Sequence, residues 1–104
     1  MSDSKLEMIL CIVNSGHSQD VMDSAKKAGA RGGTVIKARG SANPKAEELY
    51  GIPIQPEKEI VMIIVKSEIK DSVLKNLFTD CGLDNDGQGI AFSVPVSDSV
   101  GISV

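Results

Sequence analysis

The sequence contains few of the residues that several classes of function require. Among its 104 residues there are two cysteines, one histidine and only three aromatic residues, Tyr50, Phe78 and Phe92. Two cysteines are too few for a disulfide framework, and one histidine leaves little from which to build a histidine metal site or a histidine-activated nucleophile. With a net charge of -3 and few rings for base stacking, the chain is not expected to bind nucleic acid.

Long apolar stretches are also missing. The longest uninterrupted apolar runs, 8–13 and 60–65, have six residues each, whereas a membrane-spanning helix needs about 20. The first five residues lack the basic and then apolar layout of a secretory signal. Because 41% apolar and 24% charged residues are typical of globular chains, we expect one folded domain over residues 1–104, located in the cytoplasm.

The chain contains one internal repeat. Residues 7–15 align without gaps to residues 59–67, and each copy has an acidic residue, six apolar residues, one polar residue and a serine. Each copy is followed by a pattern with apolar residues on one helix face. We interpret Ser18 and Ser67 as the N-caps of these two helices, and we expect each helix to end on a left-handed glycine, Gly29 or Gly82. The repeat therefore predicts two strand–helix units.

A second strand is expected after each helix. Residues 33–39 and 89–96 mix apolar and polar side chains, and the latter stretch alternates and contains a late proline, as an edge strand does. The order βαββαβ predicts an α+β, ferredoxin-like domain with a four-stranded antiparallel sheet. The two all-apolar runs would then be the central strands.

Both faces of these central strands would be apolar. Two helices can cover only one face, so half a dozen aliphatic side chains would remain in water, where each forgoes about 1.5–3 kcal/mol of burial. We therefore predict a homo-oligomer that buries the second face between subunits. The alternative is that the C-terminal tail or the long loop covers this face within one chain.

The long loop, residues 40–58, is a connection of 19 residues where a hairpin needs about two to five. Loops of this length in compact domains are usually functional or mobile. Within it, Asn43 and Pro44 are expected to start a short helix over 45–50, which would end at Gly51.

Few residues suggest catalysis. His17 lies in a polar turn before the first expected helix, and we interpret it as part of the lead into that helix. Cys11 and Cys81 occupy apolar positions of a strand and a helix, so we interpret both as small hydrophobic residues.

Two glycine-rich stretches, 29–34 and 87–89, are better candidates for binding. Backbone N–H groups in glycine turns can cradle anionic oxygens. The first stretch is followed by Lys37 and Arg39, which concentrate positive charge in an acidic chain. In the duplicated fold, both stretches connect a helix to an edge strand and so lie at comparable places.

At these residues the sequence resembles the PII signalling superfamily, whose members are small trimeric ferredoxin-like proteins that bind nucleotides in the clefts between subunits. Residues 28–40 resemble the segment of PII proteins that leads into the T-loop, residues 48–50 resemble a triplet in that loop, and residues 88–92 resemble the B-loop. The resemblance covers essentially the whole chain. It implies a PII-like homotrimer with a shortened T-loop at about residues 40–58.

The resemblance also implies where ligands bind. The glycine-rich segment of one subunit would contact the adenine and ribose of a nucleotide, and the base of the loop would approach the phosphates together with the neighbour's B-loop. With the nearby cations included, the nucleotide-binding positions are Gly32, Gly33, Thr34, Arg39, Gly40, Ser41, Lys58, Gly87, Gln88 and Gly89. The partner-binding positions of the loop are Asn43, Lys45, Glu48, Tyr50, Ile52 and Ile54.

The chain departs from the family pattern in its cations. Ile90 stands at the position of the B-loop lysine, and residues 97–104 replace the basic segment that follows the last strand. Each missing cation removes a phosphate contact worth about 1.5–3 kcal/mol, for which Lys37, Arg39 or Lys58 would compensate. Residues 41–43 stand where the family has a glutamine that helps to hold 2-oxoglutarate. The chain therefore resembles a divergent PII-like protein.

These features predict a non-enzymatic sensor. An adenine nucleotide (ATP, ADP or AMP) would bind as a small effector between the subunits, and no obligatory cofactor or metal is expected. The loop would regulate a partner, a membrane transport protein, which would recruit the cytoplasmic homotrimer to the membrane. The alternative is a CutA-like metal-tolerance or purely structural trimer without nucleotide binding. A third hypothesis, a hydrolase such as an acylphosphatase, finds Asn14 and Arg31 in no recognisable arrangement.

Overall fold

A computed structural model of the chain describes residues 5–40, 51, 56–84 and 88–104. The elements in these residues are β1 (Leu6–Asn14), α1 (Ser18–Lys27), β2 (Thr34–Arg39), β3 (Glu57–Lys66), α3 (Ser67–Asp80) and β4 (Gly89–Val96). The short helix expected over 45–50 lies outside the described residues. Neither described helix is long and apolar enough to cross a membrane.

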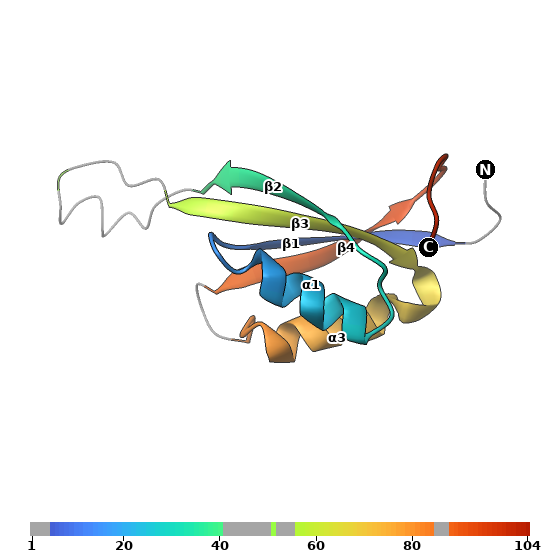
Figure 1. The fold of residues 1–104 in the computed structure, drawn as a ribbon, viewed down its shortest axis with the longest axis horizontal. Helices are drawn as coiled ribbons and strands as arrows, with labels where there is room; N and C mark the ends of the chain where they lie inside the picture. The colour runs from blue at the N-terminus through green and yellow to red at the C-terminus, as the bar shows by residue number, and fades with distance from the viewer. Residues whose placement is uncertain (1–4, 41–50, 52–55, 85–87) are drawn as a thin grey trace.

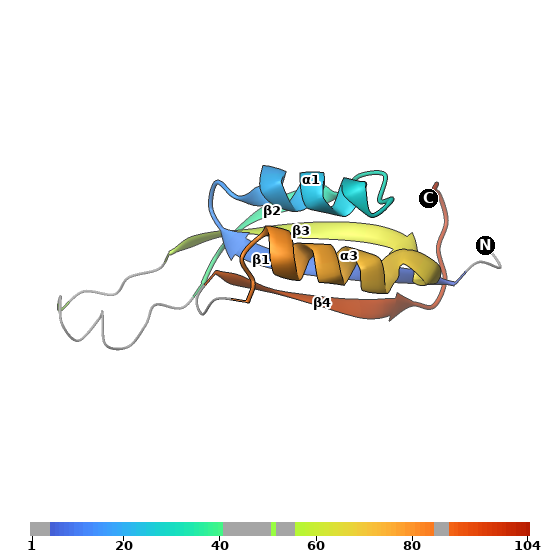
Figure 2. The ribbon, with the colours of Figure 1, turned by 90° about the horizontal axis from the view of Figure 1, so that it is seen from below.

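The four strands form one antiparallel sheet in the order β2-β3-β1-β4. Both helices lie on one side of this sheet, next to one another (Figures 1 and 2). The central strands β1 and β3 are the two all-apolar runs of the repeat, and β2 and β4 are the edges. The expected βαββαβ, ferredoxin-like arrangement is therefore confirmed.

The core lies between the sheet and the helices. On this covered face the side chains of β1 and β3 alternate inward, and they meet one apolar stripe from each helix. The buried apolar residues that pack together are Ile9, Cys11, Val13, Val21, Ala25, Ala30, Val61, Ile63, Val65, Val73 and Leu77. Polar contacts also join the helices, because the buried Ser24 Oγ donates to Asp80 Oδ2 at 3.0 Å and Asn76 Nδ2 donates to the carbonyl oxygen of Ser24 at 3.5 Å.

The opposite face of the sheet, which we call the open face, carries rows of apolar side chains in the strand register. One row runs from Ile36 through Ile60 and Ile12 to Ile90. Ile90 is 58% exposed and Phe92 41%, so water reaches this face at the β4 edge. Within one chain, the segment after β4 meets only a corner of the open face, where Ile102 lines a cavity with Met62 and Ile64. The tail therefore does not cover the face.

The helix starts differ by one residue from the sequence interpretation. Ser18 and Ser67 were expected as N-caps, but each is the first helical residue, and the caps are His17 and Lys66, neither of which makes a side-chain capping hydrogen bond. The first N–H groups are satisfied from elsewhere in the fold. The N–H of Ser18 donates to a carboxylate oxygen of Glu59, and that of Ser67 donates to the carbonyl oxygen of Lys5.

The helix ends follow the expectation, because Gly29 and Gly82 have φ values of 107° and 69°. Such left-handed angles favour glycine.

The observed strand boundaries also place the base of the loop differently from the sequence analysis. β2 begins at Thr34, one residue after the expected Gly33, and β3 begins at Glu57. Lys58, which was expected to close the loop, is therefore a strand residue paired with Ala38. The hairpin is joined at its end by Gly40, whose N–H donates to the carbonyl oxygen of Pro56 at 3.0 Å.

Candidate functional site

The first group of expected ligand positions lies at the start of β2. Thr34 and the glycines before it line a cavity of about 390 Å³, which we call the glycine cavity. Its other walls come from β3 and from the segment after β4. The lining residues are Arg31, Gly32, Gly33, Thr34, Met62, Ile64, Ile102, Ser103 and Val104.

The two adjacent glycines of this cavity have different roles. A Cβ atom on Gly33 would lie 2.7 Å from the carbonyl oxygen of Met62, so glycine is needed there for β2 to approach β3. A Cβ atom on Gly32 would meet nothing within 4 Å. Gly32 is therefore the glycine with open space around it, and its backbone is free for a ligand to approach.

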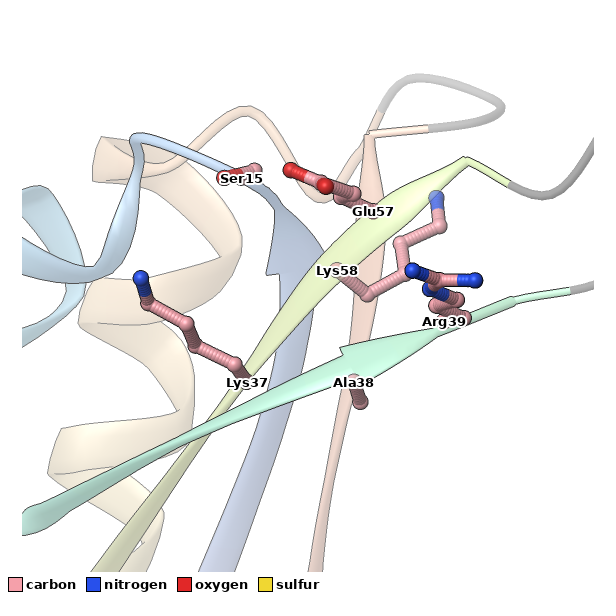
Figure 3. Close-up of a pocket in the computed structure, with 6 residues that line it drawn as sticks. All are labelled: Ser15, Lys37, Ala38, Arg39, Glu57 and Lys58. Atoms are coloured by element: carbon pink, nitrogen blue, oxygen red, sulfur yellow. The ribbon is translucent and has the colours of Figure 1, made fainter.

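The second group lies at the other end of β2, around the base of the loop. A cavity of about 290 Å³, which we call the cationic cavity, is lined by Ser15, Lys37, Ala38, Arg39, Glu57 and Lys58 (Figure 3). Three of these six residues are cations, in a chain whose net charge is -3. Anionic groups are the ligands that such a cluster favours.

The three cations differ in how they are held. Lys58 Nζ donates to Asn14 Oδ1 at 2.6 Å, across the central strand pair. Arg39 is paired in register with Glu57, yet in the described part of the chain its guanidinium makes no ion pair or side-chain hydrogen bond. In Figure 3, Glu57 points toward Ser15 and away from Arg39. The Arg39 guanidinium is therefore open to an external anion.

Lys37 points away from Arg39, toward the turn between β1 and α1 (Figure 3). Its strand partner Glu59 accepts hydrogen bonds from the N–H groups of Gly16 at 2.9 Å and Ser18 at 3.3 Å. The hydrogen bond from Gly16 is the main reason why the pKa of Glu59 lies below its ordinary value of 4.5. Glu59 thus fixes the β1–α1 turn, which supplies Ser15 to the cationic cavity.

Gly40 completes the base of the loop. A Cβ atom on it would lie 3.1 Å from Cε of Lys58, so the backbone here packs directly on the lysine stem. The structure therefore brings Arg39, Gly40 and Lys58 together. It does not bring them next to Gly32–Thr34, because five strand steps of about 3.3 Å place Thr34 about 17 Å from Arg39.

Gln88 and Gly89, the expected B-loop residues that the structure describes, line neither of these cavities. Gln88 precedes β4, and Gly89 begins that strand opposite Val13. A Cβ atom on Gly89 would lie 2.5 Å from the carbonyl oxygen of Ile12, so this glycine allows close packing of β4 on β1. These residues lie at the same end of the sheet as Arg39 but on the opposite edge. Within one chain, the expected nucleotide positions that the structure describes do not form one site.

Several expected positions lie outside the described residues. They are Ser41, Asn43, Lys45, Glu48, Tyr50, Ile52, Ile54 and Gly87.

Sequence reasoning missed two contributions to the cavities. Glu57 and Ser15 line the cationic cavity, and Ile102–Val104 line the glycine cavity. The loop was expected to extend to residue 58. Had β3 been started at Glu57 instead, this glutamate would have been paired with Arg39, so the sequence did contain the information needed to find it. No local pattern places residues 102–104 beside Gly32.

The described residues offer little catalytic or metal-binding chemistry. They contain no group of three or more His, Cys, Asp or Glu side chains that could hold a metal ion. Burial raises the pKa of Cys11 to about 12, and burial also raises the pKa of Cys81. Both thiols are therefore held in the protonated, unreactive form at neutral pH. On the surface, Nδ1 of His17 lies 3.5 Å from Oδ2 of Asp20.

Comparison with known proteins gives a consistent result. The family model of nitrogen regulatory protein P-II matches residues 6–104. The structure resembles that of Arabidopsis thaliana PII bound to citrate, with a TM-score of 0.69 and 29% identity, covering 91% of this chain and 80% of that chain. It also resembles the fold of a PII-like signalling protein from Thermus thermophilus, with a TM-score of 0.66 and 21% identity, covering 89% of this chain and 88% of that chain. No curated protein sequence matches the chain.

Proposed function

The chain belongs to the nitrogen regulatory protein P-II family, and from this premise we propose that it is a sensor that binds an adenine nucleotide in clefts between the subunits of a homotrimer. Its loop, which lies between Gly40 and Pro56, transmits the bound state to a partner. The proposal rests above all on one observation, which is that β2 carries a cavity of glycines at one end and a cavity of cations at the other.

The assembly follows from the open face and from the sheet edges. Exposed Ile36, Ile90 and Phe92 favour burial against another copy of the chain. The two edges of the sheet, β2 and β4, are unlike. Contact between unlike surfaces repeats from copy to copy and closes into a ring when the rotation allows it. A ring of three copies brings Gln88 and Gly89 of one subunit toward β2 of the next, which completes the expected set of binding positions.

The nucleotide extends along β2. Its base and ribose lie against Gly32 and Thr34, and its phosphates point toward the cationic cavity with the free guanidinium of Arg39. Because about 17 Å separates the ends of β2, adenosine reaches only the glycine cavity, whereas a triphosphate extends toward the cations. The Arabidopsis relative was solved bound to citrate, which is also an anion, and this supports an anionic effector.

The loop between Gly40 and Pro56 is the part that meets the partner. The effector binds at the base from which the loop leaves the sheet, so a ligand that contacts only one loop state shifts the population toward that state. Asn43, Lys45, Glu48, Tyr50, Ile52 and Ile54 are the proposed contacts. The partner is a membrane transport protein, and the trimer is a cytoplasmic protein that this partner recruits. The chain itself carries out no catalysis.

Titration calorimetry with adenosine, AMP and ATP tests the proposal. We expect affinity to rise with the number of phosphates. Arg39→Ala removes a charge-assisted contact worth about 1.5–3 kcal/mol, which weakens ATP about ten- to hundredfold and leaves adenosine unchanged. Lys75→Ala is the matched control, since it removes one exposed positive charge on α3, outside both cavities. Equal ATP affinity in the two variants, or no binding of any of the three ligands, would contradict the proposal.

A further inference from the structure

The end of the sheet away from the loop contains a further cavity, of about 240 Å³. We call it the junction cavity, because it lies where the chain passes from α1 toward β2 and from β3 into α3. Six of its lining residues are Gly29, Ala30, Val65, Lys66, Glu68 and Ile69. None of these six lines the glycine cavity or the cationic cavity, so the junction cavity has chemistry of its own.

The interior of the junction cavity is apolar. Gly29 has a φ of 107°, and a Cβ atom on it would lie 3.5 Å from Cδ1 of Ile69. The glycine that ends α1 therefore leaves the space over Ile69 clear, and the buried Ala30 adds a small apolar wall. An engineered dry cavity of about 150 Å³ holds benzene. The junction cavity thus has room for a branched aliphatic group such as isobutyl.

The mouth of the junction cavity is charged. An adjoining cavity of about 280 Å³ is lined by Lys5, Lys66, Ser67 and Glu68. Both cavities include Lys66 and Glu68, so these two charges stand between a polar opening and an apolar interior. Within the described residues, neither side chain makes an ion pair. A ligand that carries both a negative and a positive group would complement them.

Strand β3 also offers backbone groups at this cavity. β2 begins opposite Met62, so in the described part of the chain residues 63–66 of β3 have a strand partner only on the β1 side. Unpaired N–H and C=O groups along a strand edge can bond to a ligand. An ammonium group donates to such a carbonyl, and a carboxylate accepts from such an N–H. An apolar interior, two opposite charges and an open backbone edge together suit a free amino acid.

We propose that the junction cavity binds a free α-amino acid with a branched aliphatic side chain of the size of leucine. The carboxylate lies at Lys66, the ammonium group lies at Glu68, and the side chain packs on Ile69. A fatty acid or an alkylamine leaves one charge of the mouth without a counter-charge, and glycine leaves the apolar interior unfilled. This site lies at the opposite end of β3 from Lys58, and the proposal does not rest on nucleotide binding.

Titration calorimetry with four small molecules tests the class of ligand. L-leucine is compared with 4-methylpentanoate, which lacks the ammonium group, with 3-methylbutylamine, which lacks the carboxylate, and with glycine, which lacks the side chain. We expect each of these three to bind at least about tenfold more weakly than leucine, because each loses a charge-assisted hydrogen bond or the burial of an isobutyl group. Equal binding of leucine and any analogue, or no binding of leucine at about 10 mM, overturns the proposal.

Two variants test the roles of the charges. Glu68→Gln is expected to weaken leucine about tenfold without weakening 4-methylpentanoate, which has no ammonium group to lose. Lys66→Gln is expected to weaken leucine in the same way without weakening 3-methylbutylamine. Lys75→Gln is the matched control, because this exposed lysine of α3 lines none of the cavities described above. Unchanged leucine affinity in both Glu68→Gln and Lys66→Gln overturns the assignment.

Amide chemical shifts locate the bound leucine. Leucine should shift the ¹H–¹⁵N signals of Gly29, Lys66 and Ile69 more than those of Gly32 and Arg39, and the reverse pattern overturns the junction cavity as the site. Arg39→Ala, which is expected to weaken ATP, should bind leucine as the wild type does. Loss of leucine binding in that variant also overturns the site. Failure of this proposal is therefore distinguishable from failure of the proposed function, which the ATP titrations decide.

Discussion

The two faces of the sheet are built from the same central strands but differ in what covers them. On the helix side, residues of β1 and β3 such as Ile9, Ile63 and Val65 are between 0% and 1% exposed. On the open face the neighbouring residues in the sequence, such as Ile12 and Ile64, are only half-buried. At the edges of that face, Ile90 is 58% exposed.

This difference separates the stability of the folded chain from the stability of its association with other copies. The covered face is complete within one chain, so it determines whether the chain folds. The open face is apolar without being covered, so it determines whether copies associate. Substitutions on the two faces should therefore have different consequences, even where the residues are chemically alike.

The largest effect is expected from a charge on the open face. Phe92→Asp places a carboxylate in a surface that is dry in the proposed trimer, and an unpaired buried charge is too costly to retain. Light scattering should show the mass falling from three times the 11.0 kDa chain to one chain, with the circular dichroism spectrum unchanged. Val100→Asp, on a residue that is 86% exposed, should remain assembled. A trimeric Phe92→Asp protein would show that this face is not the interface.

A smaller effect is expected from a truncation on the covered face. Ile63 is fully buried in the middle of β3, and Ile63→Ala leaves a cavity that should lower the free energy of unfolding by about 2–5 kcal/mol. Urea denaturation at a fixed protein concentration measures this loss, and the oligomeric state of the folded fraction should not change. A loss below about 1 kcal/mol would mean that the covered face tolerates cavities and is not a close-packed core.

The smallest effect concerns the rim of the covered face, where Glu59 accepts the N–H groups of Gly16 and Ser18. Its pKa is lower in the fold than its ordinary value of 4.5, so the ionised form stabilises the fold. This contribution is complete above about pH 4.5 and is lost as the pH falls through the folded-state pKa. Urea midpoints between about pH 7 and about pH 3 should therefore depend less on pH in Glu59→Gln than in the wild type. In the control Glu57→Gln, the urea midpoint should depend on pH as it does in the wild type.

Much of the fold could be predicted because its signals are periodic. The repeat of residues 7–15 in 59–67 identified both central strands, and the alternation in 89–96 identified an edge. The helix starts could not be predicted locally, because the group that caps α1 belongs to Glu59, 41 residues away from Ser18. A sequence pattern that assigns caps to the nearest serine does not contain this contact.

The candidate site was predictable in part. The cations at the base of the loop and the glycines before β2 were identified from composition and from the resemblance, and the structure places each group in a cavity. The structure also explains Gly33 and Gly89 by close backbone approach, a requirement that a glycine-rich stretch does not reveal. The contribution of residues 102–104 depends on how the chain returns after β4, which periodicity leaves open.

The hydrogen bonds of Glu59 have a further consequence for how the chain avoids misfolding. In most sheets, a slip of one residue between neighbouring strands exposes the apolar side chains, and that cost rejects the wrong pairing. Here β1 and β3 are apolar on both faces, so a pair shifted by one residue would still present apolar side chains to the helices. Polar contacts must therefore disfavour the shifted register relative to the native one. A slip would turn Glu59 to the other face and leave the start of α1 uncapped, so this carboxylate distinguishes the native alignment from its nearest competitors.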